Sequence, residues 1–595
     1  MKDRLDIEYR YKWDLKDIYS SIEDWRQDLD KLKQMLPNIE KYRGRLGDKD
    51  TLLEYYEFAK QVDILMDKVS TYIFLNHLID VSNDEYNGYL CEVENLYNNF
   101  ALMSSFVLPE LNSYDVSYLE SLLEDKRFEL HKMGIKDIIK NKPHILSEEL
   151  EEVVTKVGNF SGAFSDTYDA FDAVDISFED AIDSKGEKHK VTSSNYGKLM
   201  ESRDRVLRKN VYENFFKPYK TYCSTIANNY IGSVKKDWFF ANVYKFGSVL
   251  ESNLNGRDLS KKLYYNLIDN VNRALPLKHK WNRLKKKIFG LDKAYPYDMS
   301  VPLTSSDRHF EYNEAVDIVK SALKILGDDY LDMITKAIDT NWIDVYPTKN
   351  KDTGGCNVDI YGLNSHILLN YEGTFSDVST LAHELGHAMH AYFSQKNQPY
   401  EYCGTNIFLA EIASTTNEAI LKKYMLKNAK DDDEKIYILQ EYIGLIMGAL
   451  FGQVMFSEFE DYAHKLVERE EPITKELLLN KYYELQTKYN GDDIERMDEQ
   501  HYGFLIVTHF YRAYYVYTYA TGVTCAINFA KFCEKDDKAI DRVRQFLASG
   551  ISDYPMNILK SCGIDLETDE PYNILFEELD WAINEVARLC NVEID

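Results

Sequence analysis

The stretch from Thr380 to His390 constrains the fold of this 595-residue chain more than any other. It lies within an apolar pattern of helical period, formed by Val378, Leu381, Leu385, Ala388 and Tyr392. A helix here places His383 and His387 one turn apart on the face opposite the apolar stripe, with Glu384 beside them. We expect this helix to begin with Ser376 or Asp377 as its N-cap, because both side chains can cap and both directly precede the periodic run.

The residues His383-Glu384-x-x-His387 form a pattern that binds zinc when it lies on a helix. Two imidazoles at this spacing can hold one ion, and Glu384 can remove a proton from water at the open coordination position. We therefore predict one Zn²⁺ per chain. The alternative is a buried helix whose histidines are hydrogen-bonded. Gly386 costs about 1 kcal/mol relative to Ala inside a helix, which predicts close approach of another group there, such as a substrate backbone.

A catalytic zinc site needs a third protein ligand. Glu411 and Glu418 are seven residues apart, and therefore share one face of a second predicted helix. If the two helices lie antiparallel, Glu411 can complete a His, His, Glu ligand set while Glu418 orients a ligand imidazole from behind. A pair of glutamates on a solvated face is the alternative. His390 is the rival third ligand, but it lies farther along the same helix, so we expect it to pack or donate a supporting hydrogen bond.

The composition predicts a mainly α protein. Glycine and proline are sparse, at 27 and 12 residues, and the ranges 50–80, 147–158 and 435–466 show helical periodicity. We expect a large helical fold in two unequal parts, with a boundary in the polar segment 182–194. This divides the chain into an N-terminal helical domain, residues 1–190, and a zinc catalytic domain, residues 191–595. The turn-rich segment 348–362 and a short strand at 366–371 predict a small β-sheet directly before the zinc helix.

The charge balance argues against nucleic acid as a partner, because 99 acidic residues outnumber 71 basic ones and repel phosphate. We find no secretion signal and no uncharged apolar run of 18 residues, so we expect a cytoplasmic protein without a membrane span. The eight cysteines show no Cys-x-x-Cys spacing, which argues against both a disulfide framework and a thiolate metal site. Nothing in the sequence indicates the oligomeric state.

An aromatic cluster lies at Thr508 to Tyr517 and could supply hydrogen-bond donors to the oxyanion formed when water attacks a peptide carbonyl. On one helix, Tyr514 and Tyr517 are one turn apart, whereas Tyr511 and Tyr515 share a different face. An aromatic packing stripe is the alternative, and the spacing leaves both open.

Together these residues resemble the oligoendopeptidase F family, the bacterial branch of the thimet-type zinc oligopeptidases. The similarity includes Tyr11 to Leu15, Asn370 to Thr374, Asp377 to His387, the Glu411 helix, His509 to Gly522 and Phe546 to Gly550. The resemblance implies a mostly helical fold enclosing a deep cavity, with one zinc held by His383, His387 and Glu411 and with Glu384 as the base. It also implies that His509, Tyr514 and Tyr517 assist the transition state, with His501 as the alternative helper histidine.

The resulting hypothesis is a zinc metalloendopeptidase that hydrolyses internal bonds of short, unfolded peptides. Glu384 would act as the base and Tyr517 would stabilise the oxyanion. The first alternative is a carboxypeptidase or dipeptidyl carboxypeptidase with the same zinc helix. An alternative of another class is an inactive peptide-binding scaffold. The intact Glu384 and the complete ligand set argue against it.

Overall fold

A computed structural model of the chain describes residues 3–158, 160–304, 308–535 and 540–594. Helices dominate it, which confirms the prediction of a mainly α fold. The chain forms two compact units, and each unit collects stretches that are far apart in sequence. Unit 1 comprises Met1–Glu148, Arg308–Leu421 and Phe529–Gly563, and unit 2 comprises Glu149–Asp307, Lys422–Asn528 and Ile564–Asp595. The boundary predicted near residue 190 therefore lies inside unit 2.

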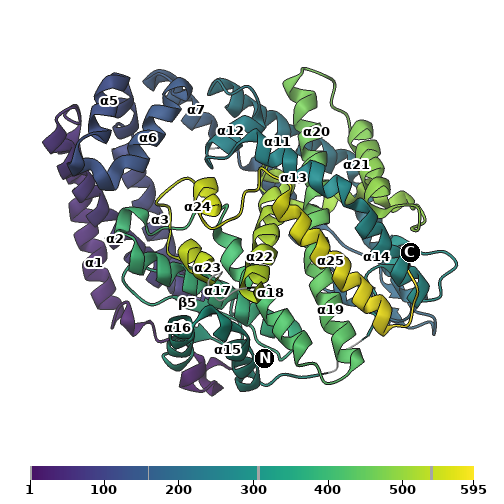
Figure 1. The fold of residues 1–595 in the computed structure, drawn as a ribbon. Coiled ribbons are helices and arrows are strands. Elements are labelled where there is room, and N and C mark those ends of the chain that lie inside the picture. Colours follow the sequence, from purple (N-terminus) through teal and green to yellow (C-terminus); the bar gives the residue numbers. More distant parts are fainter. Residues whose placement is uncertain (1–2, 159, 305–307, 536–539, 595) are drawn as a thin grey trace. The chain divides into compact units, whose positions relative to one another are not determined.

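Unit 1 contains the N-terminal helices, the predicted zinc helix and the segments that flank this helix (Figure 1). Its helices are α1 (Ile22–Met35), α2 (Lys49–Ile79), α3 (Asp84–Ser104), α4 (Val107–Ser113), α5 (Val116–Leu123), α6 (Lys132–Asn141), α15 (Tyr312–Leu323), α16 (Asp328–Asp339), α17 (Phe375–Asn397), α23 (Ile540–Leu547) and α24 (Pro555–Ser561). Helix α18 (Ala410–Lys427) starts in this unit. The range 50–80, predicted as helical, coincides with α2.

Unit 2 is built from helices and one short hairpin. Its elements are α7 (Glu148–Gly158), α8 (Ala163–Ala170), β1 (Ala181–Ile182), β2 (Lys188–His189), α9 (Tyr196–Met200), α10 (Arg205–Thr221), α11 (Cys223–Val243), α12 (Val249–Asn255), α13 (Lys261–Arg273), α14 (Leu275–Ile288), α19 (Asp432–Ile446), α20 (Gln453–Glu468), α21 (Lys475–Asn490), α22 (Tyr517–Lys535, ending in unit 1) and α25 (Glu570–Leu589). The predicted helical ranges 147–158 and 435–466 fall on α7 and on α19 with α20.

The core of unit 1 joins its N-terminal helices to the small sheet. Trp25 of α1 is fully buried, and its indole nitrogen donates to the carbonyl of Val69 in α2 at 3.0 Å. The same apolar cluster includes Ile360 and Leu368 from the sheet region. The N-terminal helices therefore support the elements that precede α17.

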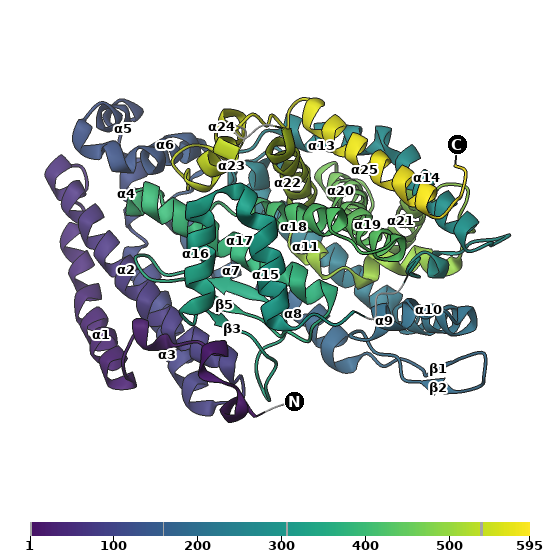
Figure 2. The same ribbon diagram turned by 60° about the horizontal axis from the view of Figure 1, so that its bottom comes forward.

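The sheet has three strands, β3 (Ile343–Asp344), β4 (Cys356–Val358) and β5 (His366–Leu368), in the order β3-β5-β4. β3 runs parallel to β5, and β4 runs antiparallel to it with Asn357 opposite Ile367. Figure 2 shows β3 and β5 beside α15, α16 and α17. The small sheet expected before the zinc helix is thus confirmed, and β4 is one of its edges.

A buried ion pair fixes this sheet. Lys351 lies in the segment predicted as a turn, yet its side chain is fully buried and its ammonium is 2.7 Å from the carboxylate of Asp344. Lys351 also donates to the carbonyl of Leu369 at 2.5 Å. Arg4 pairs with the other carboxylate oxygen of Asp344 at 2.5 Å, so the N-terminal segment is tied to β3.

One stretch among the described residues, Asp432–Glu468, is long and apolar enough to cross a membrane by length and composition. Half of its most apolar window is buried inside the protein. Its α20 portion packs against α11, α13 and α21. Because the core helix of a soluble protein passes the same test, a single helix of this kind gives little support for a membrane span.

Candidate metal centre

Helix α17 begins two or three residues earlier than expected. Thr374 is the N-cap, and its hydroxyl accepts from the backbone N–H of Asp377 at 3.2 Å. The Asp377 carboxylate accepts in return from the N–H of Thr374 at 2.8 Å, which makes a capping box. The prediction of Ser376 or Asp377 as the N-cap was therefore wrong. Asp377 caps from the third position, where its charge also suits the positive end of the helix dipole.

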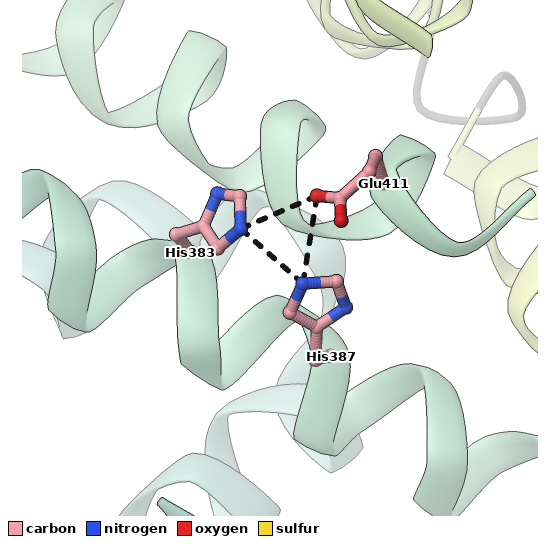
Figure 3. A group of neighbouring side chains, drawn as sticks. All are labelled: His383, His387 and Glu411. Atoms are coloured by element: carbon pink, nitrogen blue, oxygen red, sulfur yellow. Dashed lines mark hydrogen bonds and ion pairs between the residues drawn. The ribbon is translucent and has the colours of Figure 1, made fainter. Parts of the chain in front are cut away.

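Three side chains converge on one point in unit 1 (Figure 3). The Nε2 atoms of His383 and His387 are 3.2 Å apart. The Oε2 atom of Glu411, from α18, lies 3.4 Å from Nε2 of His383 and 3.6 Å from Nε2 of His387. Ligands about 2.1 Å from a tetrahedral zinc ion are about 3.4 Å from one another. The three atoms thus have both the chemistry and the spacing of a three-ligand zinc site.

Glu418 supports this group from behind. Its Oε1 lies 2.9 Å from Nδ1 of His383, and its Oε2 accepts from the hydroxyl of Ser379 at 2.7 Å. A carboxylate at Nδ1 keeps a proton on that nitrogen, which leaves Nε2 as the ring atom that can bind a metal ion. Ser414 donates to Oε2 of Glu411 at 3.2 Å and restrains this candidate ligand.

Helices α17 and α18 lie in unusually close contact at Gly386. A Cβ atom at this position would be only 2.6 Å from Cα of Ser414 and 2.9 Å from the carbonyl oxygen of Ala413. The close approach predicted at Gly386 is real, but its partner is the backbone of α18, not a substrate. Asn417 adds a second link, because its amide donates to the carbonyl of Ala382 at 3.0 Å.

The charges of the two imidazoles depend on their neighbours in the metal-free protein. Burial lowers the pKa of His383, but its bonds to Glu411 and Glu418 outweigh burial and raise that pKa to about 10. Burial and the neighbouring charge on His383 lower the pKa of His387 to about 4. One positive charge is therefore held between the carboxylates, at a place that a metal cation can take instead.

Glu384 is buried, with 6% of its surface exposed. Burial raises the pKa of its carboxyl to about 7, and the charges of Glu411 and Glu418 add to the rise. Its Oε1 lies against the 353–355 turn, 3.2 Å from where a Cβ on Gly355 would be. A cleft of about 390 Å³ within unit 1 is lined by His383, Glu384, His387, Glu411 and the 355–359 segment that contains β4. Glu384 therefore shares one cleft with the three candidate metal ligands.

His390 is not part of the ligand triangle. It is 3% exposed, and its ring packs on Phe546 of α23 at 4.9 Å between centroids. The packing role expected for it is confirmed.

The aromatic cluster at 508–517 belongs to unit 2 and is not one helix, contrary to the expectation. Thr508–Tyr511 forms a short 3-10 turn, Tyr514 has a left-handed φ of 50°, and α22 begins at Tyr517. His509 is exposed and stacks parallel to Tyr515 at 6.0 Å. His501 stacks on Tyr483 at 3.9 Å. The catalytic roles of His509, Tyr514 and Tyr517 stay predictions, with His501 as the alternative histidine.

Two pairs of supporting residues were not predicted from the sequence. Ser379 and Asn417 connect α17 to α18, and Arg257 and Glu460 hold the segment around Tyr514. All four act through contacts between residues distant in the chain. Only the polar character of Ser379 and Asn417 at positions facing inward could have suggested a role.

The model for peptidase family M3 matches residues 198–577, and that for oligopeptidase F matches residues 110–178. This chain belongs to peptidase family M3. Oligopeptidase PepF of Bacillus subtilis is 35% identical over 99% of this chain and 88% of the relative. Group B oligopeptidase PepB of Streptococcus agalactiae is 33% identical over 99% of this chain and 98% of the relative.

Solved structures agree with this M3 assignment. A chain from Chlamydophila abortus is 31% identical with a TM-score of 0.92, and the alignment covers 99% of this chain and all of that one. Oligoendopeptidase F from Enterococcus faecium is 27% identical with a TM-score of 0.74, covering 95% of this chain and 99% of that one. The protein is therefore an M3 metallopeptidase, and it shares its fold with oligoendopeptidase F from Enterococcus faecium.

Proposed function

We propose that this M3 peptidase is a zinc endopeptidase that hydrolyses internal bonds of short, unfolded peptides. The observation that carries the proposal is the triangle of His383, His387 and Glu411, whose ligand atoms are 3.2 to 3.6 Å apart. Two nitrogens and one carboxylate oxygen are a ligand set that zinc takes in catalytic sites. The site would hold one zinc ion per chain.

When bound, the ion supplies Lewis-acid polarisation of the scissile carbonyl and lowers the pKa of its water. Glu384 accepts a proton from the attacking water and delivers it to the leaving amine, so one water adds across one peptide bond. Glu384 is buried in the same cleft as the three proposed ligands, so its carboxylate lies beside the water that it would deprotonate. Glu418 keeps the Nδ1 proton of His383 in place, and Tyr517 would donate a hydrogen bond to the oxyanion.

The cleft and the sheet edge support a peptide substrate. The 355–359 segment lines the same cleft as Glu384 and contains the edge strand β4. An extended peptide can pair with such an edge through main-chain hydrogen bonds. Recognition of this kind depends on the extended main chain of the peptide more than on its side chains. The relatives named oligopeptidase fit substrates of this class. No disulfide joins the cysteines among the described residues, which is usual in a reducing compartment, and we place the enzyme in the cytoplasm.

Glu384→Gln tests the proposal. The variant should bind zinc as the parent protein does, because Glu384 is not a ligand, yet it should lose at least about 100-fold in kcat, because the base is gone. The assay uses a quenched peptide blocked at both termini, with zinc measured by titration of the chelator-treated protein. Glu372→Gln, at an exposed position near the start of α17, is the matched control and should keep full activity.

The outcomes separate the alternatives. An active Glu384→Gln variant removes the base assignment. Cleavage that requires a free C-terminus and vanishes on blocked peptides identifies a carboxypeptidase or dipeptidyl carboxypeptidase. Peptide binding without turnover in the zinc-loaded parent protein identifies an inactive scaffold.

A further inference from the structure

The metal cleft of unit 1 is lined by acidic side chains but, among the described residues, by no lysine or arginine. Besides the three candidate ligands, its acidic residues are Glu384 and Asp359. A zinc ion held by the candidate ligands would offset the negative charge at its own end of the cleft. Asp359 lies outside that group, so its charge has no basic counterpart among the residues that line the cleft.

Asp359 lies at the end of the cleft away from the metal ligands. At the other end, Oε1 of Glu384 is 3.2 Å from where a Cβ on Gly355 would be. An extended chain advances about 3.3 Å per residue, so Asp359 is up to about 13 Å farther along. Gln395, which bonds to Asp359, gives a similar distance, because it follows His387 by eight residues, or about 12 Å along α17. Asp359 is thus about three or four peptide residues from the metal site.

The Asp359 carboxylate is held in place and is open to solvent. Oε1 of Gln395 accepts from the backbone N–H of Gly362 at 3.0 Å. The amide nitrogen of Gln395 is therefore the donor in its bond to Asp359. Asp359 is exposed, and within the described part of the chain no basic side chain forms an ion pair with it. A neutral amide fixes the carboxylate without cancelling its charge, so its other acceptor positions stay available.

A second carboxylate adds to the negative potential at this end of the cleft. The protein around Asp67, in α2, displaces water from its carboxyl and raises the pKa of that group to about 6, and the charge of Asp359 adds to the rise. Lys60, two turns earlier on α2, does not offset these charges, because its ammonium is 3.0 Å from the carboxylate of Glu401. A positively charged group beside Asp359 would therefore be attracted to both Asp359 and Asp67.

We propose that Asp359 is a specificity-determining residue, which binds a positively charged nitrogen of the peptide substrate about three or four residues from the bond that is cut. Lysine and arginine side chains and a free amino terminus share this chemistry. The inference rests on the proposed endopeptidase function, because it needs a peptide extended along this cleft. A contact so far from the reacting carbonyl is made equally in the ground state and the transition state. The preference should therefore appear in KM and leave kcat within about threefold.

Two sets of quenched peptides test this on the full-length zinc enzyme. The first set is blocked at both termini and carries one lysine or one glutamine at each position near the cleaved bond, which mass spectrometry locates. The second set has no charged side chain and has either a free or an acetylated amino terminus. In at least one set the positively charged peptide should have a kcat/KM about 5- to 20-fold higher. Raising NaCl from about 0.05 M to about 0.5 M should reduce this preference.

Asp359→Asn removes the charge and keeps an acceptor for Gln395. It should reduce the preference to less than about twofold, while kcat on the neutral peptide and zinc affinity stay within about threefold. Asp359→Lys should instead favour a glutamate peptide over the matching lysine peptide. Asp339→Asn, which removes an exposed acid of α16 in the same unit, is the matched control and should keep the preference of the parent protein.

The results separate this inference from the proposed function. A parent enzyme that cuts charged and neutral peptides equally well overturns the inference and leaves the proposed function standing. A preference that Asp359→Asn retains belongs to other residues and also overturns it. A parent enzyme that cuts no blocked peptide contradicts the proposed function itself and, with it, this inference. If Asp359→Asn does not fold by circular dichroism, Gln395→Ala, which frees the Asp359 carboxylate, takes its place, and a preference that neither this change nor added salt reduces overturns the inference.

Discussion

Replacing Gly386 with alanine should weaken metal binding far more than it weakens the fold. In an exposed helix interior this change is favourable by about 1 kcal/mol, because alanine has the higher helix propensity. At Gly386 the new methyl group would be 2.6 Å from Cα of Ser414, in the backbone of α18. Ser414 lies between Glu411 and Glu418 in the sequence of α18, so a displacement of the helix at Ser414 moves both carboxylates.

The geometry sets the size of the effect. Ordinary contact begins at 3.4 Å, so the two helices must separate by about 0.8 Å at this point. A zinc site tolerates about 0.2 Å in its ligand distances, and the Glu411 oxygen is already 3.4 and 3.6 Å from the two imidazole nitrogens. We expect zinc affinity to fall by about 10- to 100-fold. Overpacking costs about 1 to 3 kcal/mol, part of which the helix propensity offsets.

The assay is a zinc titration of the apoprotein against a competing chromophoric chelator, together with the thermal midpoint from circular dichroism. Gly88→Ala is the control, since Gly88 lies inside α3 in the same unit and a Cβ there would meet nothing within 4 Å. That variant should bind zinc normally and be slightly more stable. A Gly386→Ala protein with the zinc affinity of the parent would refute the argument that the contact of the two helices sets the ligand geometry.

Three further predictions each follow from the contacts of one side chain. Glu418→Ala removes the acceptor at Nδ1 of His383 and should lower zinc affinity by about 10- to 100-fold in the same titration, with little change in the thermal midpoint. Lys351→Met removes one of the two cations that pair with the buried Asp344 and should lower the free energy of unfolding by about 3 kcal/mol in urea, whereas exposed Lys349→Met should change it by less than about 0.5 kcal/mol. Burial raises the pKa of the Glu460 carboxyl to about 8. The folded protein therefore keeps the full stabilisation from protonated Glu460 below about pH 4.5 and loses it as the pH rises through 8. Glu460→Gln should therefore gain thermal midpoint relative to the parent protein between pH 6 and pH 9, and an unchanged difference would contradict this.

Local patterns predicted most of the helices and the three residues that meet at the candidate metal site. The helical period around His383 depends on residues close in the chain, and so does the seven-residue spacing of Glu411 and Glu418. The antiparallel pairing of the two helices followed from the length of the link between them. These predictions needed no knowledge of distant contacts, which is why the structure agrees with them.

The errors have a common physical cause, which is contact between distant residues or a competing local cap. Thr374 caps α17 because Asp377 can bond back to it, an arrangement that Ser376 and Asp377 as isolated N-cap residues did not suggest. The single helix predicted over 508–517 is broken at Tyr514, where Glu460 and Arg257 hold a left-handed residue. Lys351 looks like a turn residue until Asp344 is placed beside it.

The proposed metal ligands are held by contacts within unit 1. Glu418, Ser379 and the close contact of the two helices at Gly386 restrain them, whereas Glu384 makes none of these contacts. Zinc affinity should therefore fall when Glu418 or Gly386 is changed, and it should be unaffected by Glu384→Gln, which should lower kcat alone. If Glu384→Gln also weakened zinc binding, metal binding and proton transfer would not be separable in this site.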